Sequence, residues 1–362
     1  MVNPLLRAFI PATPSSPSFA HSAGRWNWLG LRHVNGARTS VHLGAYPPLK
    51  PNAFRTPLGR KFGEVLYVRQ ERTLRRMTSR RDALGIKVDD DLFARWLSWF
   101  APDPQPFLVK RDDPLEILGA PLLEKFDSQL RDTFEVYNLD SDTLWRFIGA
   151  AEFLGLPQKS RAQLVRAQCK LGRSLVPSVR SWPSLEVHGI RCQGDGYRFV
   201  WWPSLLEGNE EKVLIPYIED GRRKSRHAEV AAAVWRRTQA ILPGARELAG
   251  TFPRNSGPNC FGAVMSAAGI VGAAEEWMQR EPFESWLAEK TRPGGDDDAP
   301  GTVLVWRSPD RLAQHAAITL GDGWALHKPS QGWMSPTKVL AVAEVKSSAR
   351  ARQRHLSRRS LL

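Results

Sequence analysis

The chain has 362 residues and a formal net charge of +14, with 42% hydrophobic and 24% charged residues, which is typical of a globular protein with one large or two ordinary domains. No run of eighteen apolar residues occurs, so the sequence predicts no transmembrane segment. Three cysteines argue against a disulfide framework, and without a recognisable signal peptide they predict a cytoplasmic protein, although export by a non-classical route stays open.

The positive charge lies at the two ends of the chain. Residues 1–88 carry +12 and residues 346–362 carry +6, so the body between them carries −4. Residues 1–63 are rich in proline and basic residues, and we predict that they form a disordered arm. Residues 346–362 are predicted to be a basic tail. Such ends can contact nucleic acid or an anionic surface, but a solvated arm is the simpler interpretation.

Residues 64–180 are predicted to be a mainly helical region. Residues 64–81 can form one basic helix, and the apolar spacing from Leu92 onward predicts a second helix behind an acidic cap. Three further helices are predicted over 113–137, 140–157 and 159–175. The last of these carries Cys169, which we interpret as a small packing residue.

The pattern changes after residue 180, where the sequence predicts a second domain over 181–345. Residues 184–206 alternate around a Gly-Asp-Gly turn and predict a hairpin that carries Cys192, again as a packing residue. Residues 212–218 predict a short strand, and residues 225–242 predict a helix.

The last third of the chain has the clearest pattern. A helix is predicted from Cys260 to about Gly269, and another over 272–290, broken near Pro282. A Gly/Pro/Asp loop follows, and its Asp296-Asp297-Asp298 run is interpreted as solvated rather than as a cation site. Strands are then predicted over 302–307, 314–320 and 324–329. Helices and antiparallel strands in separate runs indicate an α+β fold.

Cys260 differs from the other cysteines by its position. Gly257 and Pro258 end the preceding segment, Asn259 is a favourable N-cap, and Cys260 takes the first helical position. The helix dipole and the free N–H groups there favour a thiolate, and the same groups can hold an oxyanion. Gly262 is expected to leave the backbone open to a substrate. The alternative interpretation is a core cysteine at a helix start.

A thiolate nucleophile needs a base, and two histidines, His315 and His327, lie on adjacent predicted strands downstream of Cys260. If the Gly-Asp-Gly loop between those strands has three residues, Leu320 pairs with Trp324 and the histidines share one face of the sheet. A two-residue turn pairs the strands differently and puts the histidines on opposite faces. The turn composition permits both forms. An ordinary half-buried strand residue is the alternative for each histidine.

The segments "PNCFGAV", "PGTVLVWR" and "QHAAITLGDGWALHKP" together resemble the NlpC/P60 branch of the papain-like cysteine peptidases. The resemblance covers about residues 250–345. It implies a papain-like domain in which a helix bearing Cys260 packs on a small antiparallel sheet. It also implies that Cys260 is the nucleophile, that His315 is the general base and that His327 orients His315.

The resemblance thus implies a bacterial thiol protease or amidase that cleaves a peptide, isopeptide or other amide bond, with no cofactor and no metal. A deamidase or an acyltransferase on the same scaffold, and a catalytically inactive binding module, stay open as alternatives. The family's usual Asp-Cys-Ser-Gly is Asn-Cys-Phe-Gly here, with Phe261 in place of a small hydroxyl residue. The implied partner is a peptide or amide substrate, with a cell-wall peptide as one candidate. Trp306, Trp324 and Trp333 flank the predicted site and are candidates for a substrate cleft.

Overall fold

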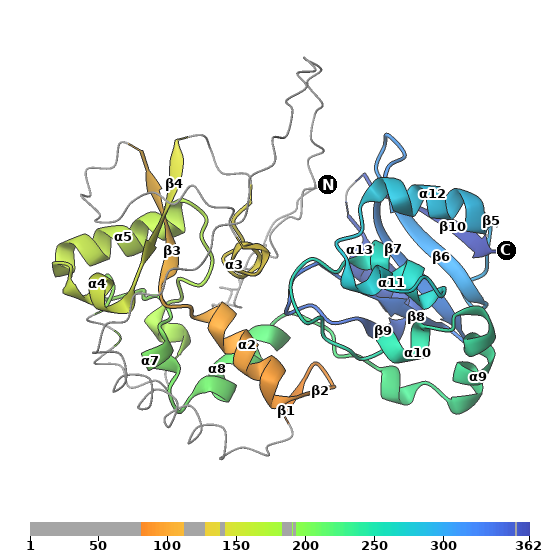
Figure 1. Cartoon of the computed structure of the whole chain (residues 1–362), viewed down its shortest axis with the longest axis horizontal. Coiled ribbons are helices and arrows are strands. Elements are labelled where there is room, and N and C mark those ends of the chain that lie inside the picture. The colour runs from red at the N-terminus through yellow and green to blue at the C-terminus, as the bar shows by residue number, and fades with distance from the viewer. Residues whose placement is uncertain (1–80, 112–126, 138–141, 183–189, 191–192, 352) are drawn as a thin grey trace, which may run out of the picture. The chain divides into compact units, whose positions relative to one another are not determined.

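The computed structural model describes residues 81–111, 127–137, 142–182, 190, 193–351 and 353–362 (Figure 1). All of them belong to one compact unit, Lys61–Leu362, which mixes helices and sheets and confirms the α+β class. The predicted arm over 1–63, the basic helix over 64–81 except its last residue, and Cys192 lie outside the described residues; Arg81 begins a strand instead. Within the described part of the chain, every helix is too short or too polar to cross a bilayer.

A six-stranded antiparallel sheet forms the centre of the C-terminal part, in the order β5-β10-β6-β7-β8-β9 (Figure 1). The three predicted strands are confirmed as β6, β7 and β8. The strands are β5 (Thr291–Pro293), β6 (Pro300–Arg307), β7 (Ala313–Gly321), β8 (Trp324–His327), β9 (Lys338–Ala341) and β10 (His355–Leu361).

Helices cover both faces of this sheet, because alternate side chains of its central strands are apolar on each side. On one face, residues such as Val305 and Ile318 pack against α9 (Ala232–Ile241), α11 (Cys260–Ala267) and α12 (Arg280–Lys290). On the other face, Leu304 and Ala317 pack against α13 (Val342–Ala349). Short helices α10 (Ala245–Leu248) and η3 (Ala273–Glu275) complete the α11 side, and η2 (His227–Glu229) precedes α9. The two faces are called the α11 face and the α13 face below.

The β7–β8 hairpin combines the two turn forms that the sequence left open. Gly321 pairs with Trp324 across a two-residue turn, in which Asp322 has a φ of 50°. A bulge between Thr319 and Gly321 then shifts the register, so that Thr319 pairs with Ala325. The two histidines therefore share a face, which is the first of the two arrangements that the sequence left open, but the extra residue stands in the strand rather than in the turn.

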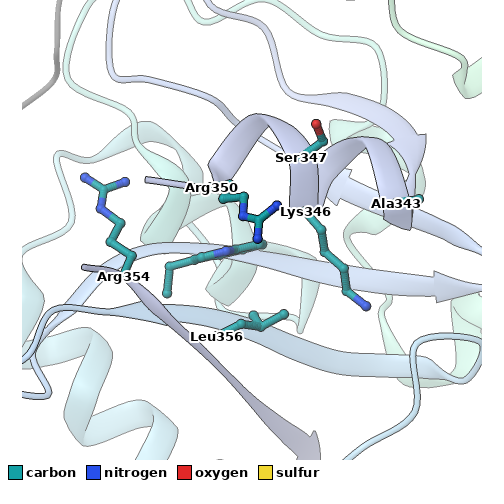
Figure 2. Close-up of a pocket in the computed structure, with 7 residues that line it drawn as sticks. Ala343, Lys346, Ser347, Arg350, Arg354 and Leu356 are labelled. Atoms are coloured by element: carbon teal, nitrogen blue, oxygen red, sulfur yellow. The ribbon is translucent and has the colours of Figure 1, made fainter. Parts of the chain in front are cut away.

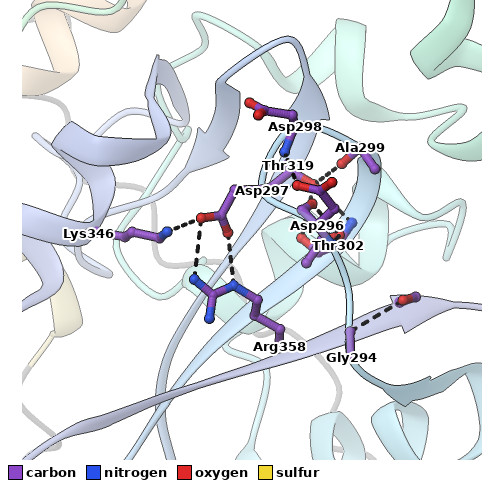
Figure 3. Close-up of polar contacts among 10 residues, drawn as sticks. Gly294, Asp296, Asp297, Asp298, Ala299, Thr302, Thr319, Lys346 and Arg358 are labelled. Atoms are coloured by element: carbon purple, nitrogen blue, oxygen red, sulfur yellow. Dashed lines mark hydrogen bonds and ion pairs between the residues drawn. The ribbon is translucent and has the colours of Figure 1, made fainter.

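The C-terminal segment 346–362 is not the solvated basic tail that its composition predicts. Strand β10 lies between β5 and β6 and pairs with both. The side chain of Arg358 donates to the carboxylate of Asp297, which also accepts from Lys346 (Figure 3). Lys346, Arg358 and Arg359 thus find side-chain and backbone partners inside the fold, and the sheet extends to Leu361, past the domain end expected at residue 345.

The first described region contains strands as well as the predicted helices. Helix α2 (Asp90–Phe100) and helix α5 (Gln158–Lys170) follow the prediction. The helix predicted over 140–157 is confirmed only in its second half, as α4 (Ala150–Gly155), because its first half forms β4 (Thr143–Ile148), which pairs with β3 (Gln105–Lys110). Its residues are mostly β-branched or aromatic, and their partner strand is distant in sequence. The remaining elements are β1 (Arg81–Ala83), β2 (Ile86–Val88), α3 (Ser128–Thr133) and η1 (Val179–Ser181).

Two predictions for the middle of the chain are also corrected. The described part of the expected hairpin, residues 193–206, contains no extended strand and ends in α7 (Pro203–Leu206). The expected strand over 212–218 is α8 (Glu210–Glu219) instead. Two glutamates in its first turn stabilise the helix by interacting with the positive end of its dipole. Its apolar residues lie on one helical face, which packs in the core.

Candidate active site

Cys260 occupies the predicted position at the start of α11. Asn259 is the N-cap, and its side-chain oxygen accepts from the N–H groups of Phe261 and Gly262, each at 3.1 Å. The Asn259 amide nitrogen also donates to the Met278 carbonyl at 2.7 Å, which fixes the cap against the neighbouring loop. The Asn259 cap therefore occupies two of the N–H groups that were expected to bind an oxyanion. The N–H group of Cys260, beside the sulfur, is the one that remains for this role.

The two residues after Cys260 serve packing rather than substrate access. Phe261 is buried, and its ring stacks on Phe283 with 4.3 Å between ring centroids. Gly262 lies against the backbone of Ala273, where a Cβ atom would stand 2.1 Å from the carbonyl oxygen. The expectation that Gly262 leaves the backbone open to a substrate is thus wrong, and Phe261 carries no information about the substrate.

We expect Gly262→Ala to lower the free energy of unfolding by about 2 kcal/mol or more, because the added methyl group must push α11 away from Ala273. Gly155 is the matched control, since it is also helical and a Cβ atom there meets nothing within 4 Å. Urea unfolding of both variants measures the difference. Equal stability of Gly262→Ala and the parent protein would show that the helix does not approach Ala273 so closely.

His315 and His327 contact each other directly. Their Nε2 atoms lie 2.8 Å apart, and the two rings are nearly perpendicular at 87°. Both side chains are buried, and the Trp306 ring lies 5.4 Å from that of His315. The Nδ1 atom of His327 is buried and has no hydrogen-bond partner in the described parts of the chain. Because Nε2 of His315 is occupied by His327, Nδ1 is the nitrogen that His315 can offer to a third group.

Cys260 and the histidine pair reach the same end of β7 from opposite faces of the sheet. Helix α11 packs on the face that carries Ala316, whereas His315 and His327 share the α13 face with Ala317. The backbone N–H of Ala316, which directly follows His315, acts on the Cys260 sulfur and opposes the rise in the pKa of its thiol. Among the residues that the structure describes, no hydrogen bond joins that sulfur to either histidine.

Burial keeps the candidate nucleophile and the candidate base uncharged. Burial raises the pKa of the half-buried Cys260 thiol to about 11, although backbone N–H groups and the Lys328 charge act in the opposite direction. Burial, assisted by the charge of Arg354, lowers the pKa of His315 to about 3. Burial and the neighbouring His315 lower the pKa of His327 as well. The resting site at neutral pH is therefore a thiol beside two neutral imidazoles.

Lys328 is a functional candidate that the sequence argument missed. It directly follows His327, so strand alternation directs its side chain to the α11 face, where Cys260 lies. The side chain is only 3% exposed, and its Nζ donates to the Ser335 carbonyl at 2.6 Å. Burial lowers the pKa of Lys328 to about 7, opposed by the charges of Cys260 and Asp132. The position of this lysine in the mostly apolar segment "WALHKP", directly after His327, was the feature of the sequence that could have indicated a buried lysine near the site.

Asp132 is the second buried charge near the site. It lies in α3 and accepts a hydrogen bond from the Tyr137 hydroxyl, and burial raises its pKa, although the Ser256, Tyr137 and Gln331 side chains oppose this. The next residue, Thr133, accepts from the Trp333 indole nitrogen at 2.8 Å. Ser256 in turn accepts from the Trp333 amide at 3.1 Å. These bonds join α3 to the loop before Cys260 and to the loop after β8.

We expect Lys328→Met to slow alkylation of Cys260 by iodoacetamide several-fold at pH 6, where Lys328 is still charged, because the positive charge that favours the thiolate is lost. Lys338→Met is the matched control, since Lys338 is equally buried at 3% exposed and donates to the Arg223 carbonyl. Peptide mapping by mass spectrometry follows the label at each cysteine. If both variants label Cys260 as fast as the parent protein, Lys328 does not act on the thiol.

The other candidates from the sequence are placed elsewhere. Cys169 is exposed on α5, so it is not the packing residue that was predicted. Trp333 is fully buried and packs on Trp96, and Trp324 lies under the Arg226 guanidinium, so only Trp306 touches the histidine pair. No cluster of three metal-ligating side chains occurs among the described residues. In the Asp296–298 run, Asp297 is neutralised by two basic side chains (Figure 3).

No family model, no curated protein and no solved structure matches the chain.

Proposed function

We propose that the protein is a thiol-dependent hydrolase of the NlpC/P60-like, papain-like type, which cleaves a peptide, isopeptide or other amide bond. Cys260 is the nucleophile, His315 the general base and His327 the residue that orients His315. The observation that supports this most is the 2.8 Å contact between the histidine Nε2 atoms. The amide of Ala316, the next residue after His315, favours the Cys260 thiolate. A base held by a second polar group beside a nucleophile is the arrangement that acyl transfer requires.

The proposed reaction begins from neutral groups. As the Cys260 sulfur attacks the acyl carbon, its proton passes to Nδ1 of His315, and the carbonyl oxygen becomes an oxyanion. The Cys260 amide at the start of α11 is the donor left for that oxyanion, since Asn259 occupies the next two. The imidazolium then gives its proton to the leaving amine, which leaves a thioester. Water, activated by His315, hydrolyses the thioester and restores the thiol.

The proposed reaction requires a particular nitrogen of each histidine to carry the ring proton. His315 can accept a proton at Nδ1 only if its Nε2 carries hydrogen and donates to Nε2 of His327. His327 then holds its own hydrogen at Nδ1. Because Cys260 and His315 lie on opposite faces of the sheet, the proton transfer also requires the sulfur and Nδ1 of His315 to meet at the end of β7 when substrate is bound.

A simple acyl donor tests the proposal without knowledge of the natural substrate. The full chain carrying Cys169→Ser and Cys192→Ser is mixed with p-nitrophenyl acetate, and p-nitrophenolate release is followed in the first turnover. We expect a burst and a thioester on Cys260 in peptide maps, both absent in Cys260→Ala. A folded protein that gives no burst and no acetyl group on Cys260 would overturn the proposal.

One observation favours the non-catalytic alternative. Burial raises the pKa of the Cys260 thiol, and the described residues show no hydrogen bond from the sulfur to His315, which suits a papain-like binding module as well. The burst assay separates the two functions, because a binding module forms no thioester. Deamidation and acyl transfer pass through the same thioester, so they differ only in the acyl donor and in the group that receives the acyl unit.

A further inference from the structure

A cavity of about 470 Å³ opens on the α13 face of the sheet (Figure 2). Cys260 does not line it, although the lining residue Arg354 interacts electrostatically with the Cys260 thiol. Trp306 of β6 and Leu356 of β10 form its apolar part. The same Trp306 ring lies beside His315, so the cavity neighbours the histidine pair. Its volume falls in the range of small-molecule sites, and it is large enough for a compact organic ligand.

Basic side chains surround this cavity. Lys346, Arg350 and Arg354 all line it, and Figure 2 shows them arranged around its opening. Lys346 is already paired with the carboxylate of Asp297, which Arg358 also binds (Figure 3). Arg350 and Arg354, by contrast, form no ion pair with a carboxylate among the described residues. Two guanidinium groups are thus available at the cavity.

The origin of this charge lies in the local chain path. Arg350 caps the C-terminal end of α13, and Arg354 directly precedes β10, so a short connection brings both to one side of the cavity. A guanidinium group donates two parallel hydrogen bonds to a phosphate or carboxylate, which makes arginine the usual ligand for such groups.

We propose that this cavity binds a small organic oxyanion, in which a phosphate or carboxylate is held by Arg350 and Arg354 while a short apolar body lies against Trp306 and Leu356. The apolar part explains why an organic anion fits better than a free inorganic ion. The proposal does not depend on the hydrolase function, since no step at Cys260 enters it.

Calorimetric titration of the full chain at physiological salt tests the site, with phenyl phosphate and benzoate as probes and benzyl alcohol as the uncharged control. We expect phenyl phosphate or benzoate to bind, and the tighter probe identifies the acid group. Benzyl alcohol should bind at least about tenfold more weakly. Binding of all three compounds with equal affinity would overturn the proposal.

Variants separate this cavity from other basic parts of the chain. Arg350→Gln combined with Arg354→Gln should weaken binding at least about tenfold, and Arg354→Lys should weaken it in part, because the charge stays while the forked geometry is lost. Arg246→Gln, on an exposed arginine of α10, is the matched control and should leave binding unchanged. Cys260→Ala should also bind normally, which keeps this result distinct from the hydrolase test. Unchanged affinity in the folded double variant would overturn the assignment.

Discussion

We expect His315→Asn to acylate Cys260 at least about a hundredfold more slowly than the parent protein at pH 7. The substitution removes the group that accepts the thiol proton, and a positioned base typically contributes a hundredfold or more. Burial raises the pKa of Cys260 to about 11, so very little thiolate is present at neutral pH without that base. The loss should therefore be close to the full contribution of the base.

The rate constant for p-nitrophenolate release in the first turnover measures this effect. His327→Asn should cause a smaller loss, because it orients His315 through the Nε2 contact but does not take the proton. His227→Asn is the control, since His227 forms a hydrogen bond with Ser225 and contacts neither the His315–His327 pair nor the Cys260 thiol. Acylation at the parent rate in folded His315→Asn would contradict the assigned base.

The second large effect concerns stability in acid. Burial lowers the pKa of His315 from 6.5 to about 3, so the unfolded chain takes up a proton at a higher pH than the folded protein does. The stabilising contribution is therefore complete above about pH 6.5 and is lost as the pH falls towards 3. For His315 alone the maximal loss corresponds to about 5 kcal/mol. His327 shifts in the same direction and adds to it.

Urea unfolding at several pH values between 7 and 4 measures this loss. We expect the free energy of unfolding to fall across that interval in the parent protein, and to fall less steeply in His315→Gln. His355→Gln is the matched control, because His355 is exposed on β10 and should leave the slope unchanged. A pH dependence that is identical in the parent protein and His315→Gln would show that His315 is not held neutral by burial.

Local chemistry was enough to predict the elements around the candidate site. Asn259 is followed by a run of small and apolar residues, and this cap and helix start are both local features. Strand alternation narrowed His315 and His327 to two arrangements, and the structure has the one in which they share a face. The bulge before Gly321 was not predictable, because it depends on how β7 meets its neighbours rather than on the turn sequence.

Features that depend on distant partners were missed. The composition of residues 355–361 predicts a basic tail, but in the structure they pair with β5 and β6, and Arg358 binds Asp297. Residues 143–148 look helical beside the following helix, but they pair with β3, whose sequence gives no sign of its partner. The sequence did not identify Lys328 as a candidate for the same reason, since its side chain is buried by contacts with residues outside its own strand, such as Ser335. Non-local contacts decide these cases.

The pH dependence of Cys260 acylation tests the central claim most directly. The rate of p-nitrophenolate release is measured from pH 5 to pH 10 in the full chain with the other two cysteines replaced by serine. If His315 takes the thiol proton, the rate should be nearly constant between pH 5 and pH 8, because burial keeps His315 neutral throughout that interval. A rate that instead rises about tenfold per pH unit across the range, as for an unassisted thiol whose pKa burial raises to about 11, would contradict a Cys260–His315 pair.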